Sequence, residues 1–340
     1  MQKNYWPTTQ WQASDPATLR MDSEKLSALE PTIKSEYSNI NGIVVVRNGY
    51  IAYESYYNGY GPDDSHHVAS VTKSILSALI GIAIDAGYIK SVDQKVLDFF
   101  PEYVPDAADR QKREITIRHL LTMTAPYPFE DWHEPLDKMC MQPDWVKYTL
   151  DMLGQQGSIG AFKYSTAGAH LLSAILTRST GTSAREFANE RLFKPIGMKE
   201  IPDYEMKSFG FEDLFGKNVK GWVNDPNGNS TGGWGLTLTP RDMARFGFVY
   251  LNRGHWDNHQ IVSEAWIDES TAMTPHNYGY LWWLREEDGV FATLALGDGG
   301  NVICCIPEKD LVVAMASEFI IHPRDRWTLI KEWIIPAVID

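Results

Sequence analysis

The chain contains few cysteines and has no pair of them suited to a structural disulfide. Cys140, Cys304 and Cys305 give an odd count of three. Adjacent side chains point to opposite faces of a strand, so Cys304 and Cys305 cannot pair with each other there. We therefore expect three free thiols, a pattern typical of a reducing compartment.

Basic residues are also scarce, since 31 of them face 44 acidic residues and leave a net charge of −13. An acidic protein repels polyanions, which argues against nucleic acid and against anionic membranes as partners. The longest apolar run, residues 75–86, is too short to cross a bilayer. The residues that follow Lys3 do not include the apolar stretch that a secretory signal peptide needs. We expect a cytoplasmic protein, and the sequence leaves its oligomeric state open.

Strand-forming segments lie near both ends of the chain. Residues 42–47 and 50–57 flank Asn48-Gly49, the strongest short hairpin signal. Residues 278–284, 290–296, 301–306 and 311–317 also favour strands, whereas residues 66–275 favour helices and loops. These segments predict an α/β (α+β) fold with one antiparallel sheet of about five strands, flanked by the terminal helices. Residues 1–65 and 276–340 would form this sheet lobe, residues 66–275 a mostly helical lobe, and an active site would lie between them.

Capping residues and apolar periodicity predict six helices. Pro31 marks a kink in the first, and Gly87 stops the second. Four prolines between residues 126 and 143 predict a long irregular loop, of the kind that often lines a site. The helices begin near Asp22, Ser70, Thr116, Thr166, Thr239 and Arg324.

The helix at Ser70 carries the first candidate for chemistry. Lys73 lies one turn further along the same face, so a hydroxyl and an amine meet there. The apolar residues that follow place the pair where the helix meets the core or a cleft. Burial favours the neutral amine, which can accept a proton, and the helix dipole favours a developing alkoxide. Taken alone, such a pair is more often solvated helix surface than a catalytic site.

Two further segments are less specific by themselves. Tyr164 stands before Ser165 and Thr166, which read equally as ordinary helix caps. The run 297–300, with three glycines, reads as a hairpin loop. A glycine-rich strand edge also lets a substrate lie against bare backbone N–H groups, as an oxyanion hole requires.

In this order the three motifs resemble the serine β-lactamase and penicillin-binding-protein superfamily. The likeness is closest to its class C-like hydrolases, the family VIII carboxylesterases and 6-aminohexanoate-dimer hydrolases. It covers about residues 43–317, including 115–124 and 232–242. Ser70-Val-Thr-Lys73 resembles the first motif, Tyr164-Ser165-Thr166 the Tyr-x-Asn motif, and Gly297-Asp298-Gly299-Gly300 the Lys-Thr-Gly or His-Gly-Gly motif.

The resemblance implies acyl transfer through an activated serine. Ser70 would attack a carbonyl while Lys73 accepts its proton directly or through Tyr164. Tyr164 would then protonate the leaving group and later help to activate the deacylating water. The oxyanion would lie between the backbone N–H groups of Ser70 and Asn301.

Two departures from the family pattern bear on the substrate. Thr166 stands where many relatives have Asn, which shortens that side chain's reach and tunes the site. Asp298 stands where relatives place Lys or His, so it would repel a substrate carboxylate if it faces the cleft. The alternative is that Asp298 points into the hairpin and caps backbone N–H groups. A neutral ester or amide is therefore the expected substrate, bound also by Gly299 and Gly300.

Other site types are not supported. Gln156 stands where a nucleophile elbow needs its first glycine, and the segment that starts at Asp225 lacks two residues of a calcium loop. We expect no metal and no cofactor. An apolar pocket would be shaped by aromatics chosen among Tyr127, Phe129, Trp132, Trp222 and Trp234, with Trp132 and Trp234 preferred for substrate contact.

Two other readings remain open at the level of sequence. A penicillin-interacting enzyme, either a β-lactamase or a DD-peptidase, would share the fold and the motifs. A catalytically weak binding module that keeps the penicillin-binding fold is a reading from a different class. The intact set of Ser70, Lys73 and Tyr164 weighs against the binding module.

Overall fold

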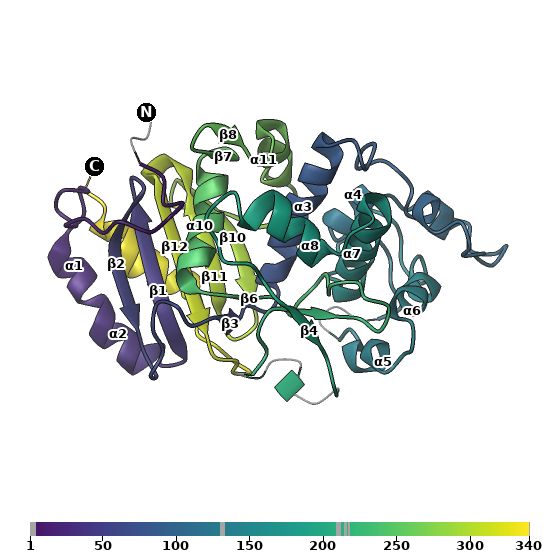
Figure 1. Ribbon diagram of the computed structural model, residues 1–340, viewed down its shortest axis with the longest axis horizontal. Helices are drawn as coiled ribbons and strands as arrows, with labels where there is room; N and C mark the ends of the chain where they lie inside the picture. Colours follow the sequence, from purple (N-terminus) through teal and green to yellow (C-terminus); the bar gives the residue numbers. More distant parts are fainter. Residues whose placement is uncertain (1–4, 130–132, 209–211, 214–215, 217, 340) are drawn as a thin grey trace.

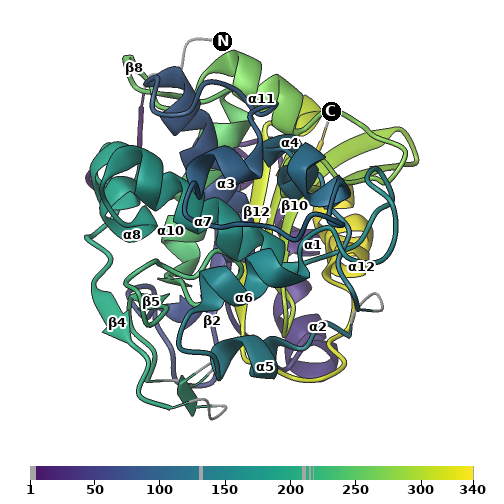
Figure 2. The same ribbon diagram turned by 90° about the vertical axis from the view of Figure 1, so that its right-hand side faces the viewer.

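The computed structural model describes residues 5–129, 133–208, 212–213, 216 and 218–339. Figure 1 shows a twisted sheet at one end of the molecule and most of the helices at the other. Strands from the beginning and the end of the chain lie side by side in this sheet, as its purple and yellow-green colours indicate. The helical end faces the viewer in Figure 2.

Six strands form the central sheet, in the order β2-β1-β12-β11-β10-β9. Every neighbouring pair is antiparallel. Both ends of the chain therefore build one antiparallel sheet, as the sequence predicted, with one strand more than the expected five. The strands are β1 (Ile40–Arg47), β2 (Tyr50–Tyr56), β9 (Trp283–Glu287), β10 (Val290–Gly297), β11 (Asn301–Ile306) and β12 (Leu311–Ser317).

The predicted hairpin between β1 and β2 is confirmed. Arg47 pairs with Tyr50 across the turn. Asn48 and Gly49 both have positive φ, 55° and 88°. A two-residue turn that matches the twist of its strands needs positive φ at both positions, which Asn and Gly tolerate best.

The expected strand over residues 278–284 is wrong in its bounds, because β9 starts at Trp283. Leu281 has a φ of 61°, which an extended strand does not accommodate. Its N–H donates to the carbonyl of Leu121, and its own carbonyl accepts from Ser74 Oγ at 2.7 Å. Contacts with helices distant in sequence therefore bend this segment. Such contacts cannot be predicted from the residues next to it in the sequence.

The helices of the middle segment and of the two termini have the following bounds. The α-helices are α1 (Ser23–Ser27), α2 (Leu29–Glu36), α3 (Val71–Asp85), α4 (Ile117–Leu121), α5 (Leu136–Cys140), α6 (Trp145–Met152), α7 (Thr166–Thr180), α8 (Ala184–Ala188), α10 (Pro240–Leu251), α11 (Glu264–Ser270) and α12 (Arg326–Leu329). Short 3-10 or π-helical turns are η1 (Val96–Phe99), η2 (Gln111–Glu114), η3 (Asn189–Phe193), η4 (Pro307–Lys309), η5 (Ile330–Ile334) and η6 (Ile335–Ala337). Short strand pairs join β3 (His66–His67) to β6 (Thr237–Leu238), β4 (Asp203–Glu205) to β5 (Trp222–Asn224), and β7 (His255–Trp256) to β8 (His259–Gln260).

Two predicted helices are less regular than expected. The first is divided at Ala28 into α1 and α2. Pro31 has no N–H to donate to the carbonyl of Ser27, so the helix cannot continue unbroken. The last α-helix begins at Arg326 and passes into π and 3-10 turns before Pro336, which again lacks the required N–H.

The sheet separates two apolar cores. On one face α1, α2 and the C-terminal helix pack on alternate strand residues such as Val45 and Val313. On the other face Val44 and Val312 join the large core that contains α3, α7 and α10. Cys304 and Cys305 fall in different cores, and all three cysteines are free thiols, as predicted.

The expected boundaries at residues 65 and 276 separate the strands of the central sheet from the middle segment, but one helix of the middle segment packs on the sheet. All six strands of the central sheet lie outside residues 66–275. However, α10 comes from the middle segment and lies on the sheet (Figure 1). A Cβ at Gly247 in this helix would come within 2.7 Å of Val312. One helix of the middle segment therefore packs closely on the sheet, and the division into two lobes stays a prediction.

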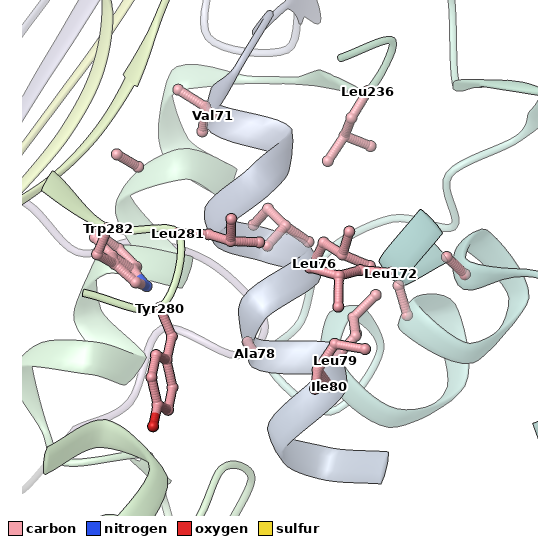
Figure 3. Packing of buried hydrophobic residues seen from close by; sticks show 14 of the residues in the cluster. Val71, Leu76, Ala78, Leu79, Ile80, Leu172, Leu236, Tyr280, Leu281 and Trp282 are labelled. Atoms are coloured by element: carbon pink, nitrogen blue, oxygen red, sulfur yellow. The ribbon is translucent and has the colours of Figure 1, made fainter. Parts of the chain in front are cut away.

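Helix α3 runs through the middle of the larger core. Figure 3 shows Leu281 and Trp282 on one side of it and Leu172 of α7 on another. Ile75, Leu76 and Leu79 have no exposed surface, and each contributes about 2 kcal/mol by burial. The helix is therefore fixed on all sides, and its N-terminus has one defined position.

Candidate active site

A tight turn presents Ser70 at the N-terminus of α3. Ser70 is the N-cap residue, with φ −70° and ψ −4°. Ala69, just before it, adopts a φ of 47°, a left-handed conformation that costs a residue with a Cβ about 1 kcal/mol. Its N–H donates to His67 Nδ1 at 3.1 Å, which fixes the turn. Within the described residues, the N–H of Ser70 donates no hydrogen bond.

Lys73 is the centre of the polar contacts at this turn. Its side chain is 1% exposed. Nζ lies 2.9 Å from Ser70 Oγ, 3.1 Å from Thr166 Oγ1 and 2.9 Å from the carbonyl oxygen of Gly233. The ring of Tyr164 lies beside it, with its centroid 4.8 Å from Nζ. Nζ forms no ion pair with any carboxylate among the described residues, so its partners are neutral oxygens.

Tyr164 approaches from the segment that precedes α7. Its ring stacks on Trp283 with centroids 5.8 Å apart, and it meets Tyr278 edge-on at 6.2 Å. The N-cap Ser165 accepts a hydrogen bond from the N–H of Gly168 at 2.9 Å, so α7 begins directly after Tyr164. The structure thus brings together Ser70, Lys73 and Tyr164, which lie 94 positions apart at the extremes of the sequence.

These residues open into a cleft of about 560 Å³ between the helices and the end of the sheet. Its volume is typical of a small-molecule site. Trp132 lies outside the described residues. Trp234 is 4% exposed and stacks on Trp145 at 5.7 Å, so it lies behind the site. The residues from the sequence analysis that line the cleft are Ser70, Tyr164, Thr166, Asp298, Gly299, Gly300 and Asn301.

The turn between β10 and β11 forms the wall opposite α7. A Cβ at Gly297 would lie 2.3 Å from the carbonyl oxygen of Val68 and 3.2 Å from the nitrogen of Ser70, so only glycine fits there. Asn301 holds the turn, because its Nδ2 donates to the carbonyl of Asp298 at 2.8 Å. The carboxylate of Asp298 is exposed at the rim of the cleft.

Arg326, which the sequence analysis missed, lies beneath this turn. It is 3% exposed, and it donates to the carbonyls of Gly300 at 3.2 Å and Gly299 at 3.3 Å. It also donates to Asn39 Oδ1 at 2.7 Å. Burial lowers the pKa of Arg326 to about 10. A buried cation therefore stands behind the turn whose rim carries the carboxylate of Asp298.

Glu134 is a second residue that sequence reasoning missed. Its two carboxylate oxygens accept the N–H groups of Thr166 and Ala167, both at 2.6 Å, and Ser165 Oγ donates at 3.3 Å. Burial raises the pKa of Glu134, although these hydrogen bonds oppose the shift. A carboxylate at the positive end of α7 stabilises the first turn of the helix. Glu134 also lines the cleft, so it supports the residues around Tyr164 from within the site.

The apolar lining of the cleft differs from the aromatics that the sequence suggested. Tyr127 and Trp222 have no exposed surface and belong to the core. Two isoleucines at the mouth are exposed, Ile320 by 40% and Ile321 by 79%. An exposed apolar strip beside a cleft is typical of a ligand-binding groove. The apolar lining consists of Leu136, Trp283, Leu296, Val302, Phe319, Ile320, Ile321 and Pro323.

The described residues contain neither a metal-binding cluster nor a membrane-spanning helix. No group of three or more His, Cys, Asp or Glu side chains in this part of the chain is placed to hold a metal ion. None of its helices has the length and apolar character needed to cross a bilayer.

Comparison with protein families identifies one match along most of the chain. The model described as Beta-lactamase matches residues 35–319. The curated 6-aminohexanoate-dimer hydrolase of Paenarthrobacter ureafaciens is 25% identical to the chain over 347 aligned positions, which cover 92% of this chain and 82% of that protein.

Solved structures show the same fold at low sequence identity. One, named provisionally as a 6-aminohexanoate-dimer hydrolase from Bacillus anthracis, has a TM-score of 0.74 at 20% identity and covers 97% of this chain and 87% of its own. EstCE1, described as a hydrolase with promiscuous acyltransferase activity, has a TM-score of 0.68 at 17% identity, with coverage of 94% and 98%. These likenesses confirm the predicted fold.

Proposed function

The chain belongs to the beta-lactamase family, and on that premise we propose that it is a serine hydrolase that cleaves small neutral esters or amides through an acyl-enzyme on Ser70. The contact between Lys73 Nζ and Ser70 Oγ, 2.9 Å long in a buried setting, carries the proposal. It joins a nucleophile directly to a base at the mouth of a cleft.

Acylation begins when the hydroxyl of Ser70 transfers its proton to Lys73 Nζ and Oγ attacks the substrate carbonyl carbon. The neutral amine donates its two N–H groups to Thr166 and Gly233, which leaves its lone pair directed at Ser70. Tyr164 then protonates the leaving alcohol or amine, and the proton held by Lys73 restores the phenol. The product of this half-reaction is the Ser70 ester and the free leaving group.

The tetrahedral intermediate needs N–H donors aimed at its oxyanion. One is the N–H of Ser70. Sequence reasoning assigned the second to Asn301, at the end of the turn. A Cβ at Gly297 would lie 3.2 Å from the nitrogen of Ser70, so the next residue, Asp298, is a second candidate for this donor. Among the described residues, the N–H of Asp298 has no acceptor.

Deacylation repeats the sequence with water as the nucleophile. Tyr164, once deprotonated by Lys73, takes a proton from water as the oxygen attacks the acyl carbon. Collapse of the second intermediate breaks the bond to Ser70 Oγ, which takes up the proton held by Lys73. The carboxylic acid leaves, and the enzyme returns to its starting state.

The cleft favours a substrate with an apolar portion. An apolar group that covers the exposed Ile320 and Ile321 at its mouth would gain free energy by removing their apolar surface from water. The carboxylate of Asp298 at the rim and the guanidinium of Arg326 behind it leave neither sign of charge dominant. A neutral ester with an alkyl chain meets both conditions, whereas the penicillin-type substrates of the alternative reading carry a carboxylate.

One experiment separates the readings. The protein and its Ser70→Ala variant are assayed with p-nitrophenyl esters of increasing acyl length, a fluorophosphonate probe and a chromogenic cephalosporin. Ser35→Ala, an exposed serine of α2, is the matched control. We expect ester turnover and labelling in the wild type and the control, and neither in Ser70→Ala. Absence of both in the wild type would favour the binding module, and rapid cephalosporin turnover would favour a β-lactamase.

A further inference from the structure

A fully buried hydrogen bond between a histidine and an aspartate lies one turn behind the site. His170 of α7 and Asp225 have no exposed side-chain surface, and Nε2 of the histidine is 3.0 Å from Oδ2 of the aspartate. Asp225 also accepts from Asn229 Nδ2 at 2.9 Å. Burial alone would raise the pKa of Asp225, but the hydrogen bonds from His170 and Asn229 hold it below its usual value. Because His170 is sealed from solvent, it cannot touch a substrate.

The pair pins the segment 225–234 to α7. Two further bonds secure the same segment: Ser173 Oγ donates to the carbonyl of Ser230 at 2.5 Å, and Trp222 Nε1 donates to that of Thr231 at 2.8 Å. The ring of His170 also packs against that of Trp145 at an angle of 59°, with centroids 5.5 Å apart. These contacts place the segment along the first turns of α7.

The end of this segment reaches the catalytic lysine. A Cβ at Gly232 would lie 2.0 Å from the carbonyl oxygen of Ala169, and one at Gly233 would lie 2.3 Å from Thr166 Cγ2. Two glycines therefore let the backbone lie in the groove of α7, and the carbonyl of Gly233 arrives 2.9 Å from Lys73 Nζ. No side chain of the segment makes this contact.

We propose that His170 and Asp225 are positioning residues: by clamping the segment 225–234 to α7, they hold the Gly233 carbonyl against Lys73 and so orient its amine toward Ser70. The inference rests on the proposed function. With Gly233 and Thr166 occupying two N–H groups, the lone pair of the neutral amine has one direction left. If the carbonyl moves away, the amine turns freely and its ammonium form loses one of three acceptors.

The expected signature is therefore kinetic and not only structural. Loss of an oriented base lowers acylation by up to about 10²-fold. The other titratable groups that face Lys73 are Tyr164 and Glu134, which the substitutions below leave in place.

The test compares His170→Leu, which removes the donor, with His170→Gln, whose amide can still reach Asp225. Val313→Ala, in the core on the far face of the sheet, is a stability control. Rates of p-nitrophenyl acetate hydrolysis and of fluorophosphonate labelling are measured from pH 5 to 10, and folding is checked by thermal unfolding. If His170→Leu does not fold, Ser173→Ala loosens the same segment more mildly.

We expect His170→Leu to lower kcat and the labelling rate, with KM within about twofold of the wild type. His170→Gln should restore most of both, and Val313→Ala should change only stability. A labelled wild type whose folded His170 and Ser173 variants keep its rates would overturn the inference alone. A wild type that is neither labelled nor active would overturn the proposed function and this inference with it.

Discussion

Glu134 shows how much of the site depends on one carboxylate. Its oxygens accept two backbone N–H groups that no intrahelical carbonyl can reach, at the positive end of α7. Thr166, one of these partners, holds Lys73. The carboxylate thus acts on the base through the helix that carries Thr166.

Glu134→Gln should therefore weaken both the helix start and the reaction. The amide presents one acceptor and one NH₂ group, so one of the two N–H donors loses its partner at a cost of about 1–3 kcal/mol. We expect a lower melting temperature and about a tenfold loss of kcat, since Thr166 and Tyr164 shift together. Thermal unfolding and steady-state kinetics measure the two effects. The exposed control Glu332→Gln should change neither the melting temperature nor kcat. A wild-type kcat in Glu134→Gln would show that the reaction does not need the two hydrogen bonds of this carboxylate.

Asp298 and Arg326 carry opposite charges and both lie at the turn between β10 and β11. Asp298 is exposed, whereas Arg326 is buried and uses its N–H groups on neutral oxygens. An exposed charge is screened by water and salt more strongly than a buried one. Reversal of the outer charge should therefore change substrate preference without disturbing the turn.

Asp298→Lys should favour substrates that carry a carboxylate. We expect the ratio of kcat/KM for p-nitrophenyl hemisuccinate to that for p-nitrophenyl butyrate to rise by about five- to tenfold at low salt, and less at high salt. Glu308→Lys, an exposed position at the other end of β11, makes the same change in net charge. An unchanged ratio in Asp298→Lys would mean that this side chain does not face the substrate.

At the scale of elements, the site depends on the close approach of two turns. The turn before α3 uses a left-handed Ala69 to expose Ser70, and the β10–β11 turn brings Gly297 against it. Both turns are anchored on rigid elements, a buried helix and a paired hairpin. Their separation is therefore fixed by the packing of α3 against the sheet.

Gly297→Ala should separate the two turns. The added methyl would meet the backbone of Val68 at 2.3 Å, so one of the turns must move. We expect acylation to fall by about 10²-fold or more, because the oxyanion donors no longer converge. Gly289→Ala in the β9–β10 turn is the matched control, since its φ of 77° makes alanine strained although nothing lies within 4 Å. Fluorophosphonate labelling of both variants measures the effect, and equal rates would contradict the role of Gly297.

The elements that could be predicted are those with local causes. Thr116 and Thr239 cap their helices because a side-chain oxygen is available at the helix start. Ser70 and Lys73 meet because three residues make nearly one helical turn. Glu134 and Arg326 escaped prediction because their partners lie 32 and 26 residues away and depend on tertiary packing. The bend before β9 escaped for the same reason.

At the scale of the whole molecule, the seam between sheet and helical region is held by buried polar groups. β3 pairs with β6, and His66 in β3 contacts Asn41 of β1 at 3.4 Å between Nδ1 and Nδ2. Asn58 donates to Asn41 Oδ1, which orients Nδ2 as the donor and makes His66 Nδ1 the acceptor. The seam thus contains a histidine that must be neutral to accept the hydrogen bond from Asn41.

Acid should weaken this seam before it protonates the carboxylates. Burial lowers the pKa of His66 from 6.5 to about 4, and also that of His67 to about 4. The unfolded chain binds these protons below pH 6.5 and the folded chain does not, so stability falls as pH decreases from about 6.5 to 4 and no further from this cause. Each histidine accounts for about 3 kcal/mol of that loss.

The variant His66→Asn keeps an acceptor for Asn41 but has no side chain that titrates in this range. The unfolding free energy of this variant should therefore fall less than that of the wild type between pH 6.5 and pH 4. Urea unfolding from pH 7 to 4.5 measures it, with the exposed His276→Asn as control. Equal slopes in wild type and His66→Asn would contradict the prediction.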